Sequence, residues 1–283
     1  MRLVRFGRPG EERPGVFDSM GTLRDASSLV TDWSGDQLEI GNLRRLAQSS
    51  FSRLPEVSGN IRLGSPIASP GKIVCVGLNY ADHAVETGFE LPKEPLVFFK
   101  SPTALTGPSD PIVVPKTATA VDWEVELAVV IGGTARNVCT ADAASFIAGL
   151  AVANDVTERN WQFERGGQWS KGKSADTFAP LGPWLATTDE FPSPLDLRIW
   201  LEKNGKSRQE SRTSRLVFSV DQIISHLSEF MTLVPGDLIL TGTPHGVAFN
   251  KAEPDYLKEG DVITCGIDGL GEQRCIVRAA KDL

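Results

Sequence analysis

The run at residues 121–132 constrains the fold most, because it has the apolar, β-branched composition of a buried strand and yet carries two carboxylates. Glu124 and Glu126 stand two residues apart. Side chains alternate along a strand, so both carboxylates point to one face. Like charges held side by side repel and lose solvation unless a cation lies between them. The pair therefore predicts a hard divalent metal ion, and two solvated glutamates on an exposed strand are the alternative.

Asp155 is the third candidate ligand. It follows the extended segment 151–154 and precedes residues 157–161, which have a helical pattern. A carboxylate at a strand exit could complete a site begun by Glu124 and Glu126, although aspartate also caps helices often. Three carboxylates on a divalent ion leave one negative charge, which favours Mg²⁺, Mn²⁺ or Ca²⁺ with positions open for substrate oxygens.

Two lysines could balance the charge of an anionic substrate at such a site. A 2-oxo acid offers a metal one carboxylate and one keto oxygen, and its binding makes the site more negative. Lys171 and Lys173 are the obvious cations, although a lysine in a loop that contains glycine is usually just solvated. These residues predict a site for a small anionic substrate.

A histidine and a glutamate form the candidate for a base. His83 and Glu86 are neighbours if residues 82–88 are helical. The carboxylate would then fix the tautomer of the imidazole and raise its basicity, as activation of water requires; a surface ion pair is the alternative. The Gly-rich turn 241–246 could hold a substrate carboxylate through its N–H groups and the Thr243 hydroxyl, although many turns share this composition.

Composition excludes several other classes of function. The net charge of −7 argues against a surface for nucleic acid or anionic membrane. No stretch approaches the roughly 18 apolar residues of a membrane span, and the N-terminus has no apolar core of a secretory signal, so we expect a cytoplasmic protein. The four cysteines lack C-x-x-C spacing, and there are only three histidines, so oxygen ligands should hold any metal.

Short apolar segments bounded by Pro and Gly predict a β-dominated α+β fold with a mixed sheet rather than a doubly wound one. We expect a small N-terminal domain over residues 1–66, opening with a hairpin, and a catalytic domain over residues 67–283. Helical periodicity is confined to a few segments, chiefly residues 218–233. The expected strands span residues 72–77, 95–100, 111–115, 121–132, 150–154, 238–240 and 262–267.

The chain resembles the fumarylacetoacetate hydrolase superfamily in six motifs, which occur in the family's order between about residue 70 and residue 275. The resemblance implies a β-sandwich roll of the family's type, a homodimer, and a Mg²⁺ or Mn²⁺ ion held by Glu124, Glu126 and Asp155. The motifs are Gly77–His83, Asp122–Leu127, Ala153–Val156, Lys171–Ser174, Pro180–Pro183 and Thr241–Pro244.

The same resemblance implies roles for other residues. His83 and Glu86 would be the catalytic dyad that activates water. Lys173 would act in catalysis and contact the substrate, and Gln168 and Thr243 would also bind the substrate. Residues 83–92 would form a lid over the bound ligand. These roles imply a hydrolase acting on a carbon–carbon bond in a ketonic substance, here a 2,4-dioxo acid.

Within the family, the N-terminal module and residues 86–92 resemble the sugar-acid branch. Its members cleave 2,4-diketo-3-deoxy-L-rhamnonate or the L-fuconate analogue to pyruvate and lactate. Two positions depart from the family pattern: Ala175 replaces an aromatic residue, and His245 replaces a small residue in the expected substrate-binding turn. A decarboxylase, tautomerase or hydrolase acting on oxaloacetate or an acylpyruvate, an isomerase of aromatic ring-cleavage products, and a non-enzymatic carbohydrate-binding β-domain are the alternatives.

Overall fold

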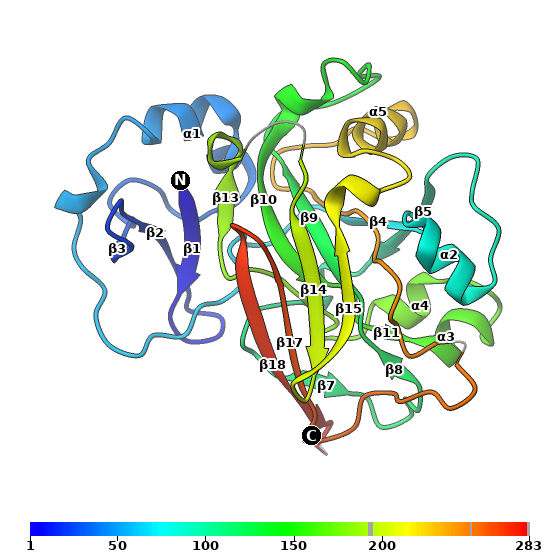
Figure 1. Cartoon of the computed structure of the whole chain (residues 1–283). Coiled ribbons are helices and arrows are strands. Elements are labelled where there is room, and N and C mark those ends of the chain that lie inside the picture. Colours follow the sequence, from blue (N-terminus) through cyan, green and yellow to red (C-terminus); the bar gives the residue numbers. More distant parts are fainter. Residues whose placement is uncertain (192–194, 250, 282–283) are drawn as a thin grey trace.

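The computed structural model describes residues 1–191, 195–249 and 251–281. Its largest sheet has nine strands in the order β3-β2-β1-β13-β10-β9-β16-β4-β5 (Figure 1). Parallel and antiparallel pairs both occur in it, so it is mixed, as the sequence predicts. Its strands are β1 (Arg2–Phe6), β2 (Arg13–Phe17), β3 (Leu23–Asp25), β4 (Ile73–Gly77), β5 (Leu96–Lys100), β9 (Val125–Ile131), β10 (Ile147–Asn154), β13 (Leu185–Thr187) and β16 (Leu238–Leu240).

A five-stranded sheet in the order β15-β14-β17-β18-β7 packs across the middle of the larger one (Figure 1). Strands β14 and β17 contact β9, and β17 and β18 contact β10. Along β14 the buried residues Ile199 and Leu201 alternate with more exposed ones, which is the pattern of a strand covered on one face. These strands are β7 (Ile112–Val114), β14 (Arg198–Lys203), β15 (Lys206–Arg212), β17 (Val262–Ile267) and β18 (Gly271–Ala279).

Two short ladders and five α-helices complete the regular structure of the described residues. Helices α3 and α4 lie beside the β8–β11 ladder, on the same side of the two sheets as helix α2 (Figure 1). The short strands are β6 (Leu105–Thr106), β8 (Val121–Asp122), β11 (Thr157–Glu158) and β12 (Ala179–Pro180). The helices are α1 (Ile40–Leu46), α2 (Ala81–Thr87), α3 (Arg159–Phe163), α4 (Ser170–Lys173) and α5 (Val220–Phe230). The 3₁₀ turns are η1 (Gly35–Leu38), η2 (Phe51–Arg53), η3 (Pro102–Ala104), η4 (Ala143–Phe146), η5 (Thr188–Glu190) and η6 (Thr213–Arg215).

The prediction of one uninterrupted strand over residues 121–132 is wrong. The chain changes partner within it, because β8 pairs with β11 whereas β9 pairs with β10. Trp123 and Glu124 lie between the two strands, and the Glu124 N–H donates to Asn154 Oδ1 at 2.9 Å. The helix expected over residues 157–161 also starts later, since Thr157 and Glu158 form β11. Most other elements match their predicted ranges, and the β-dominated α+β fold is confirmed.

The N-terminal segment forms the expected hairpin, since β1 pairs with β2 along its whole length. The other edge of β1 pairs with β13, with Leu3 opposite Leu185, so the large sheet runs without interruption from this hairpin to its centre. Arg62 also joins the two parts, because its guanidinium contacts Asp110 at 2.6 Å. The domain boundary at residue 66 stays a prediction, and the structure adds that one sheet crosses it.

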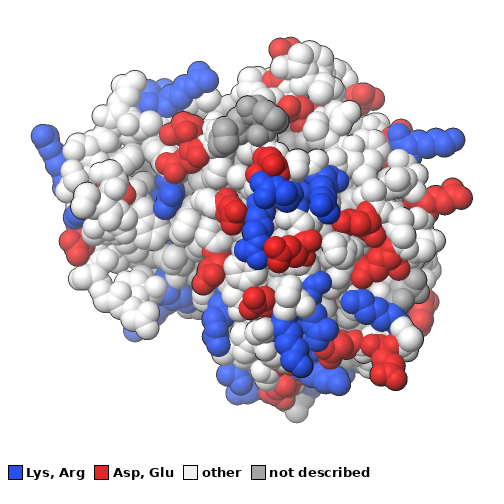
Figure 2. Space-filling view, viewed as in Figure 1, with Lys and Arg blue, Asp and Glu red and all other residues white. Residues whose placement is uncertain are grey.

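Charged side chains of both signs are interspersed on the face drawn in Figure 2. Two exposed ion pairs connect β15 to β14 and to the residues before it. Arg198 of β14 pairs with Glu210 of β15, and Arg212 of β15 pairs with Asp196. Within the described ranges, no helix is long and apolar enough to span a bilayer.

Candidate metal and substrate site

Three buried carboxylates converge where β9 begins and β10 ends. Oxygens of Glu124, Glu126 and Asp155 lie within 4.8 Å of one another, and the side chains are at most 4% exposed. The register explains the meeting, because Ala153 of β10 lies opposite Glu126 and the Asp155 N–H donates to the Glu124 carbonyl at 2.8 Å. The solvated-strand alternative is therefore wrong, and so is the helix-cap alternative for Asp155, because Glu158 caps α3 instead.

Basic side chains reach into this cluster from three elements. The Lys173 ammonium at the end of α4 bridges Glu124 Oε2 at 2.6 Å and Asp155 Oδ2 at 2.7 Å. Lys100, the last residue of β5, lies 2.5 Å from Asp155 Oδ1. Arg159 of α3 contacts Glu124 Oε1 at 2.7 Å. The expected cation Lys173 thus lies at the cluster, whereas Lys171 is exposed and donates to a backbone carbonyl.

The surroundings drive the pKa values of the two glutamates in opposite directions. Burial raises the pKa of Glu126 well above its usual value, and the charges of Asp155 and Glu124 add to the shift. Burial also acts to raise the pKa of Glu124, but Lys173 and Arg159 outweigh it and lower that pKa to about 2. Among the described residues, the Glu126 carboxylate has one hydrogen-bond donor, the Gly242 N–H at 2.7 Å.

These donors fit a divalent cation. All three are hard carboxylate oxygens, the type that Mg²⁺ and Mn²⁺ prefer. With Asp122, which binds Arg159 at 2.8 Å, four carboxylates face three cations, so the cluster would carry one excess negative charge with all four ionised, and a bound cation would favour the ionised form of Glu126. Glu124, Glu126 and Asp155 are therefore the residues that would hold the ion.

The predicted dyad lies on helix α2, which matches the expected helical segment. His83 Nδ1 is 3.7 Å from Glu86 Oε2, longer than a hydrogen bond, and this buried nitrogen has no hydrogen-bond partner among the residues that the structure describes. Glu86 Oε2 accepts the Gly246 N–H at 2.8 Å. Burial acts to raise the pKa of Glu86, but His83, the Gly246 N–H and Lys251 outweigh it, so the pKa lies below its usual value. The carboxylate is thus ionised and faces the imidazole.

The Gly-rich turn contacts protein groups on both sides. The Thr243 hydroxyl donates to the Val125 carbonyl at 2.9 Å and accepts from Gln209 Nε2 at 2.8 Å. His245 Nδ1 lies 2.9 Å from Asp82 Oδ2 of helix α2. The turn therefore connects strand β9, which carries Glu126, to the helix that carries His83 and Glu86, and the binding of substrate by Thr243 stays a prediction.

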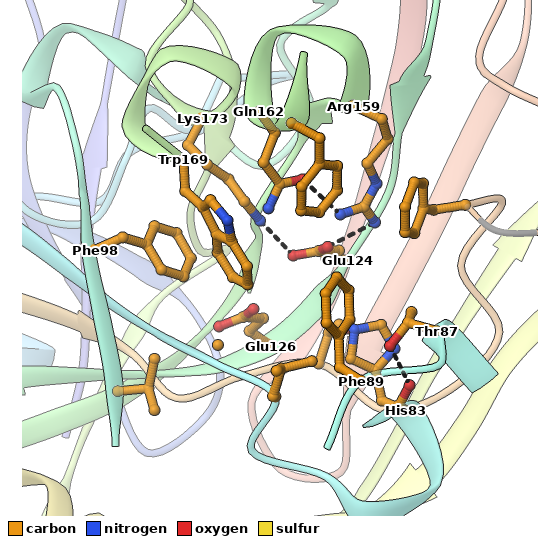
Figure 3. A pocket seen from close by; sticks show the side chains of 16 residues that line it. His83, Thr87, Phe89, Phe98, Glu124, Glu126, Arg159, Gln162, Trp169 and Lys173 are labelled. Carbon is orange, nitrogen blue, oxygen red and sulfur yellow. Dashed lines mark hydrogen bonds and ion pairs between the residues drawn. The ribbon is translucent and has the colours of Figure 1, made fainter. Parts of the chain in front are cut away.

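A small cavity brings most of the predicted residues together (Figure 3). His83, Glu124, Glu126, Lys173 and Thr243 line it. Gln168, predicted to bind substrate, is exposed and is not one of the lining residues, so its role stays a prediction without support here. Gln162 lines the cavity instead, with its side-chain oxygen 3.1 Å from an Arg159 nitrogen.

Sequence reasoning missed the aromatic wall of the cavity and two cations of the carboxylate cluster, Arg159 and Lys100. Lys100 is the lone charge of an apolar strand, and this pattern was the one available signal for a buried cation. Arg159 follows Asp155 by four residues, a spacing that gives no such signal. The aromatic side chains come from separate segments and share no spacing in the sequence. They are Phe89, Phe98, Phe163, Trp169 and Phe249.

Comparisons with known proteins agree with this site. The family model described as fumarylacetoacetate (FAA) hydrolase, C-terminal, matches residues 72–278. A protein of Burkholderia multivorans, named only in general terms as a hydrolase, is 50% identical over 282 residues, which is 99% of this chain and 100% of the relative.

Two solved structures cover nearly the whole chain. Maleylpyruvate hydrolase from Sphingobium sp. SYK-6, in complex with manganese(II) and pyruvate, is 31% identical with a TM-score of 0.81 and covers 99% of this chain and 100% of its own. A 2-hydroxyhepta-2,4-diene-1,7-dioate isomerase from Mycobacterium marinum is 34% identical with a TM-score of 0.78, and covers 100% of both chains. Both hydrolases and isomerases therefore share this fold.

Proposed function

This chain belongs to the fumarylacetoacetate hydrolase family, and we propose that it hydrolyses a carbon–carbon bond of a 2,4-dioxo acid with the help of Mg²⁺ or Mn²⁺. The observation that carries the proposal is the shared cavity, because Glu124 and Glu126 of the carboxylate cluster and the His83 imidazole line the same space. A cation site and a base that face one substrate are the two requirements of metal-assisted hydrolysis. The manganese ion and pyruvate bound by the Sphingobium enzyme support this reading.

When bound by Glu124, Glu126 and Asp155, the ion would supply Lewis-acid polarisation of the substrate's 2-oxo acid group. His83 takes a proton from water, and the resulting hydroxide attacks the C4 carbonyl carbon. Glu86 faces Nδ1 of His83, which leaves Nε2 for the water. The 3.7 Å gap should shorten as the imidazole becomes positively charged, because the ionised Glu86 attracts an imidazolium more strongly than a neutral ring.

Cleavage of the C3–C4 bond leaves its electron pair on C3, so the pyruvate half departs as an enolate and the other half as a carboxylic acid. Burial acts to lower the pKa of Lys173, but Asp155 and Glu124 outweigh it and raise the pKa to about 12, so this side chain is an ammonium at neutral pH. A fixed ammonium beside the head of the substrate stabilises the enolate charge. A proton delivered to C3 completes pyruvate, and the atoms of one water are divided between the products.

The sugar-acid branch makes 2,4-diketo-3-deoxy-L-rhamnonate or L-fuconate the first substrates to test. Isomerisation is the second candidate function, because the isomerase from Mycobacterium marinum shares the fold over the full chain. An isomerase or decarboxylase needs no attacking water, so it would retain activity without His83. The proposal includes a homodimer in the cytoplasm, which light scattering of the purified protein and cell fractionation would test.

The decisive experiment uses protein stripped with a chelator and reloaded with Mg²⁺ or Mn²⁺. A panel of 2,4-dioxo acids is supplied in ¹⁸O-labelled water, and both products are analysed by mass spectrometry. We expect pyruvate in equal amount to a second acid that carries the label in its new carboxyl group. Release of CO₂ or a shifted double bond without label would favour the decarboxylase or the isomerase. If neither ion supports the release of pyruvate, the proposal is wrong.

A further inference from the structure

We propose that the acyl group beyond C4 of the substrate is apolar and planar, an aryl or unsaturated hydrocarbon group, rather than a hydroxylated chain. This inference rests on the proposed function and names the class of substrate at the same site. It follows from the aromatic wall, which is the set of rings Phe89, Phe98, Phe163, Trp169 and Phe249 (Figure 3).

The aromatic wall is a connected cluster. The centroid of Phe163 lies 4.9 Å from that of Phe249, 5.7 Å from Trp169 and 6.0 Å from Phe89. Trp169 in turn lies 5.5 Å from Phe98. Phe163 is stacked on both Phe89 and Phe249, with interplanar angles of 27° and 24°. Such a cluster presents flat ring faces and edges, which favour a flat apolar partner.

The aromatic wall begins directly beside the charged residues. The Lys173 ammonium is 5.0 Å from the Phe98 centroid, and the Arg159 guanidinium is 5.2 Å from the Phe249 centroid. A substrate whose 2-oxo acid head binds near Lys173 therefore places its next atoms against rings. Phe89 is 39% exposed at the opening, so the wall has apolar surface that a ligand would remove from water.

Two polar groups of the same cavity already have protein partners. The Thr243 hydroxyl bonds Val125 and Gln209, and the Gln162 side-chain oxygen accepts from Arg159. A substrate hydroxyl that faced either group would compete with these bonds, and one that faced the rings would remain without a partner, which is unfavourable. The acyl group of the sugar-acid substrates, which leaves as lactate, carries one hydroxyl beyond C4, so the aromatic wall disfavours it.

A second substrate carboxylate meets the same difficulty. The Arg159 guanidinium lies 5.2 Å from the Phe249 centroid, and it already contacts Asp122 at 2.8 Å and Glu124 at 2.7 Å. Its charge is therefore neutralised by the protein before a substrate binds. Among the described lining residues the other permanent cation is Lys173, which lies at the head of the site. A dicarboxylic acyl group would leave its outer carboxylate without a free counter-charge.

The test compares benzoylpyruvate, acetylpyruvate, fumarylpyruvate and 2,4-diketo-3-deoxy-L-rhamnonate as substrates of the Mg²⁺-loaded protein. We expect kcat/KM for benzoylpyruvate to exceed that of each other compound by about tenfold or more, because burial of an aryl ring is worth more than one factor of ten. Faster cleavage of the rhamnonate compound or of the dicarboxylate fumarylpyruvate than of benzoylpyruvate would overturn the inference and leave the proposed function intact. Absence of pyruvate from every compound would overturn both.

Measurements of binding affinity separate the inferred apolar acyl site from the proposed hydrolysis. The inert 2-oxo acids 4-phenyl-2-oxobutanoate and 2-oxobutanoate share one head and differ by a ring, and calorimetry measures their dissociation constants with Mg²⁺ present. We expect the phenyl compound to bind about tenfold tighter or more. Tighter binding without hydrolysis would reject the proposed function but support the apolar acyl site. Equal binding would overturn the inference, whatever the result for hydrolysis.

Two variants locate the effect. Phe163→Leu removes the central ring of the aromatic wall, and the preference for the phenyl compound should fall at least about threefold. Phe89→Leu, at the exposed end, serves if the first variant fails to fold. The matched control is Phe99→Leu on β5, because Phe99 is exposed and does not line the cavity. A preference unchanged by both Phe163→Leu and Phe89→Leu would overturn the inference.

Discussion

Two sides of one cavity differ in how firmly the chain holds them. The ionic side is built around the start of β9 and the end of β10, and its three acidic residues are at most 4% exposed with cation contacts of 2.5 to 2.7 Å. The helix side is carried by α2 and the residues after it, where Val85 is 81% and Leu91 49% exposed. The charges of the site are thus fixed by the sheet, whereas the base sits on an exposed element that can adjust.

The difference has a chemical reason. A metal site requires its ligands to be in place before the ion binds, since ordering them costs free energy at that step. A substrate must enter between the sheet and the base, so the base has to stand on a part that can move. We therefore expect residues 83–92 to act as a lid.

The largest effect should come from the ionic side. Glu126→Gln keeps the size of the side chain but removes a carboxylate that has one hydrogen-bond donor among the described residues. We expect the variant to lose Mn²⁺ binding and to lower kcat/KM by at least about 100-fold, because the ion supplies several kcal/mol of stabilisation to the transition state. Electron paramagnetic resonance measures the binding of Mn²⁺, and the release of pyruvate measures the rate. Glu210→Gln, in an exposed ion pair, is the control and should leave both Mn²⁺ binding and kcat/KM unchanged.

The next effect concerns the base. His83→Ala should lower hydrolysis by about 10² to 10⁴-fold, the usual contribution of a general base, while Mn²⁺ binding persists because His83 is not a ligand. His226→Ala is the control, since its imidazole packs on Phe230 of α5 away from the cavity. Substantial remaining activity in His83→Ala would point to isomerisation or decarboxylation instead.

A smaller effect should come from the contact between His245 and Asp82, which fastens α2 to the turn after β16. We expect His245→Ala to lower kcat severalfold with little change of metal affinity, because it loosens the helix that carries His83 and leaves the strands intact. Hydrogen exchange should rise in α2 but not in β9. An equal rise of hydrogen exchange in α2 and β9, or a change in metal affinity alone, would contradict the division of the cavity into a fixed ionic side and an adjustable helix side.

The smallest effect concerns stability and pH. The pKa of Glu86 is lowered below its usual 4.5, so its ionised form is favoured by the fold and stabilises the protein above that pH. This contribution is lost as the pH falls through the lowered pKa. Glu86→Gln should therefore unfold about 1 kcal/mol more easily at pH 7, since it weakens a hydrogen bond to a charged group, and the difference should vanish in acid. Urea titrations at pH 7 and pH 3.5 measure it.

Local rules predicted that Glu124 lies near Glu126 and His83 near Glu86, because both pairs are short-range patterns. Glu124 and Glu126 needed only the alternation of a strand, and His83 and Glu86 only the pitch of a helix. The break at Trp123 escaped prediction because it depends on a change of partner from β11 to β10, which is a property of the whole sheet.

The aromatic wall and Gln162 escaped for the same reason. Phe89, Phe163 and Phe249 come from three segments that only the tertiary fold brings together. Gln168 and Gln162 are similar in chemistry, and only the path of the chain after α3 decides which of the two faces the cavity. Long-range packing therefore determines which substrates fit, even though short motifs indicate the chemistry.

The position of β16 has a consequence for the order in which the chain can fold. This strand enters the large sheet between β9 and β4, although it comes more than a hundred residues after both of them. Until residues 238–240 leave the ribosome, β9 and β4 both have an unpaired edge in the middle of the future sheet, where foreign strands can attach. A chain shortened before β16 should therefore aggregate rather than form a smaller functional enzyme.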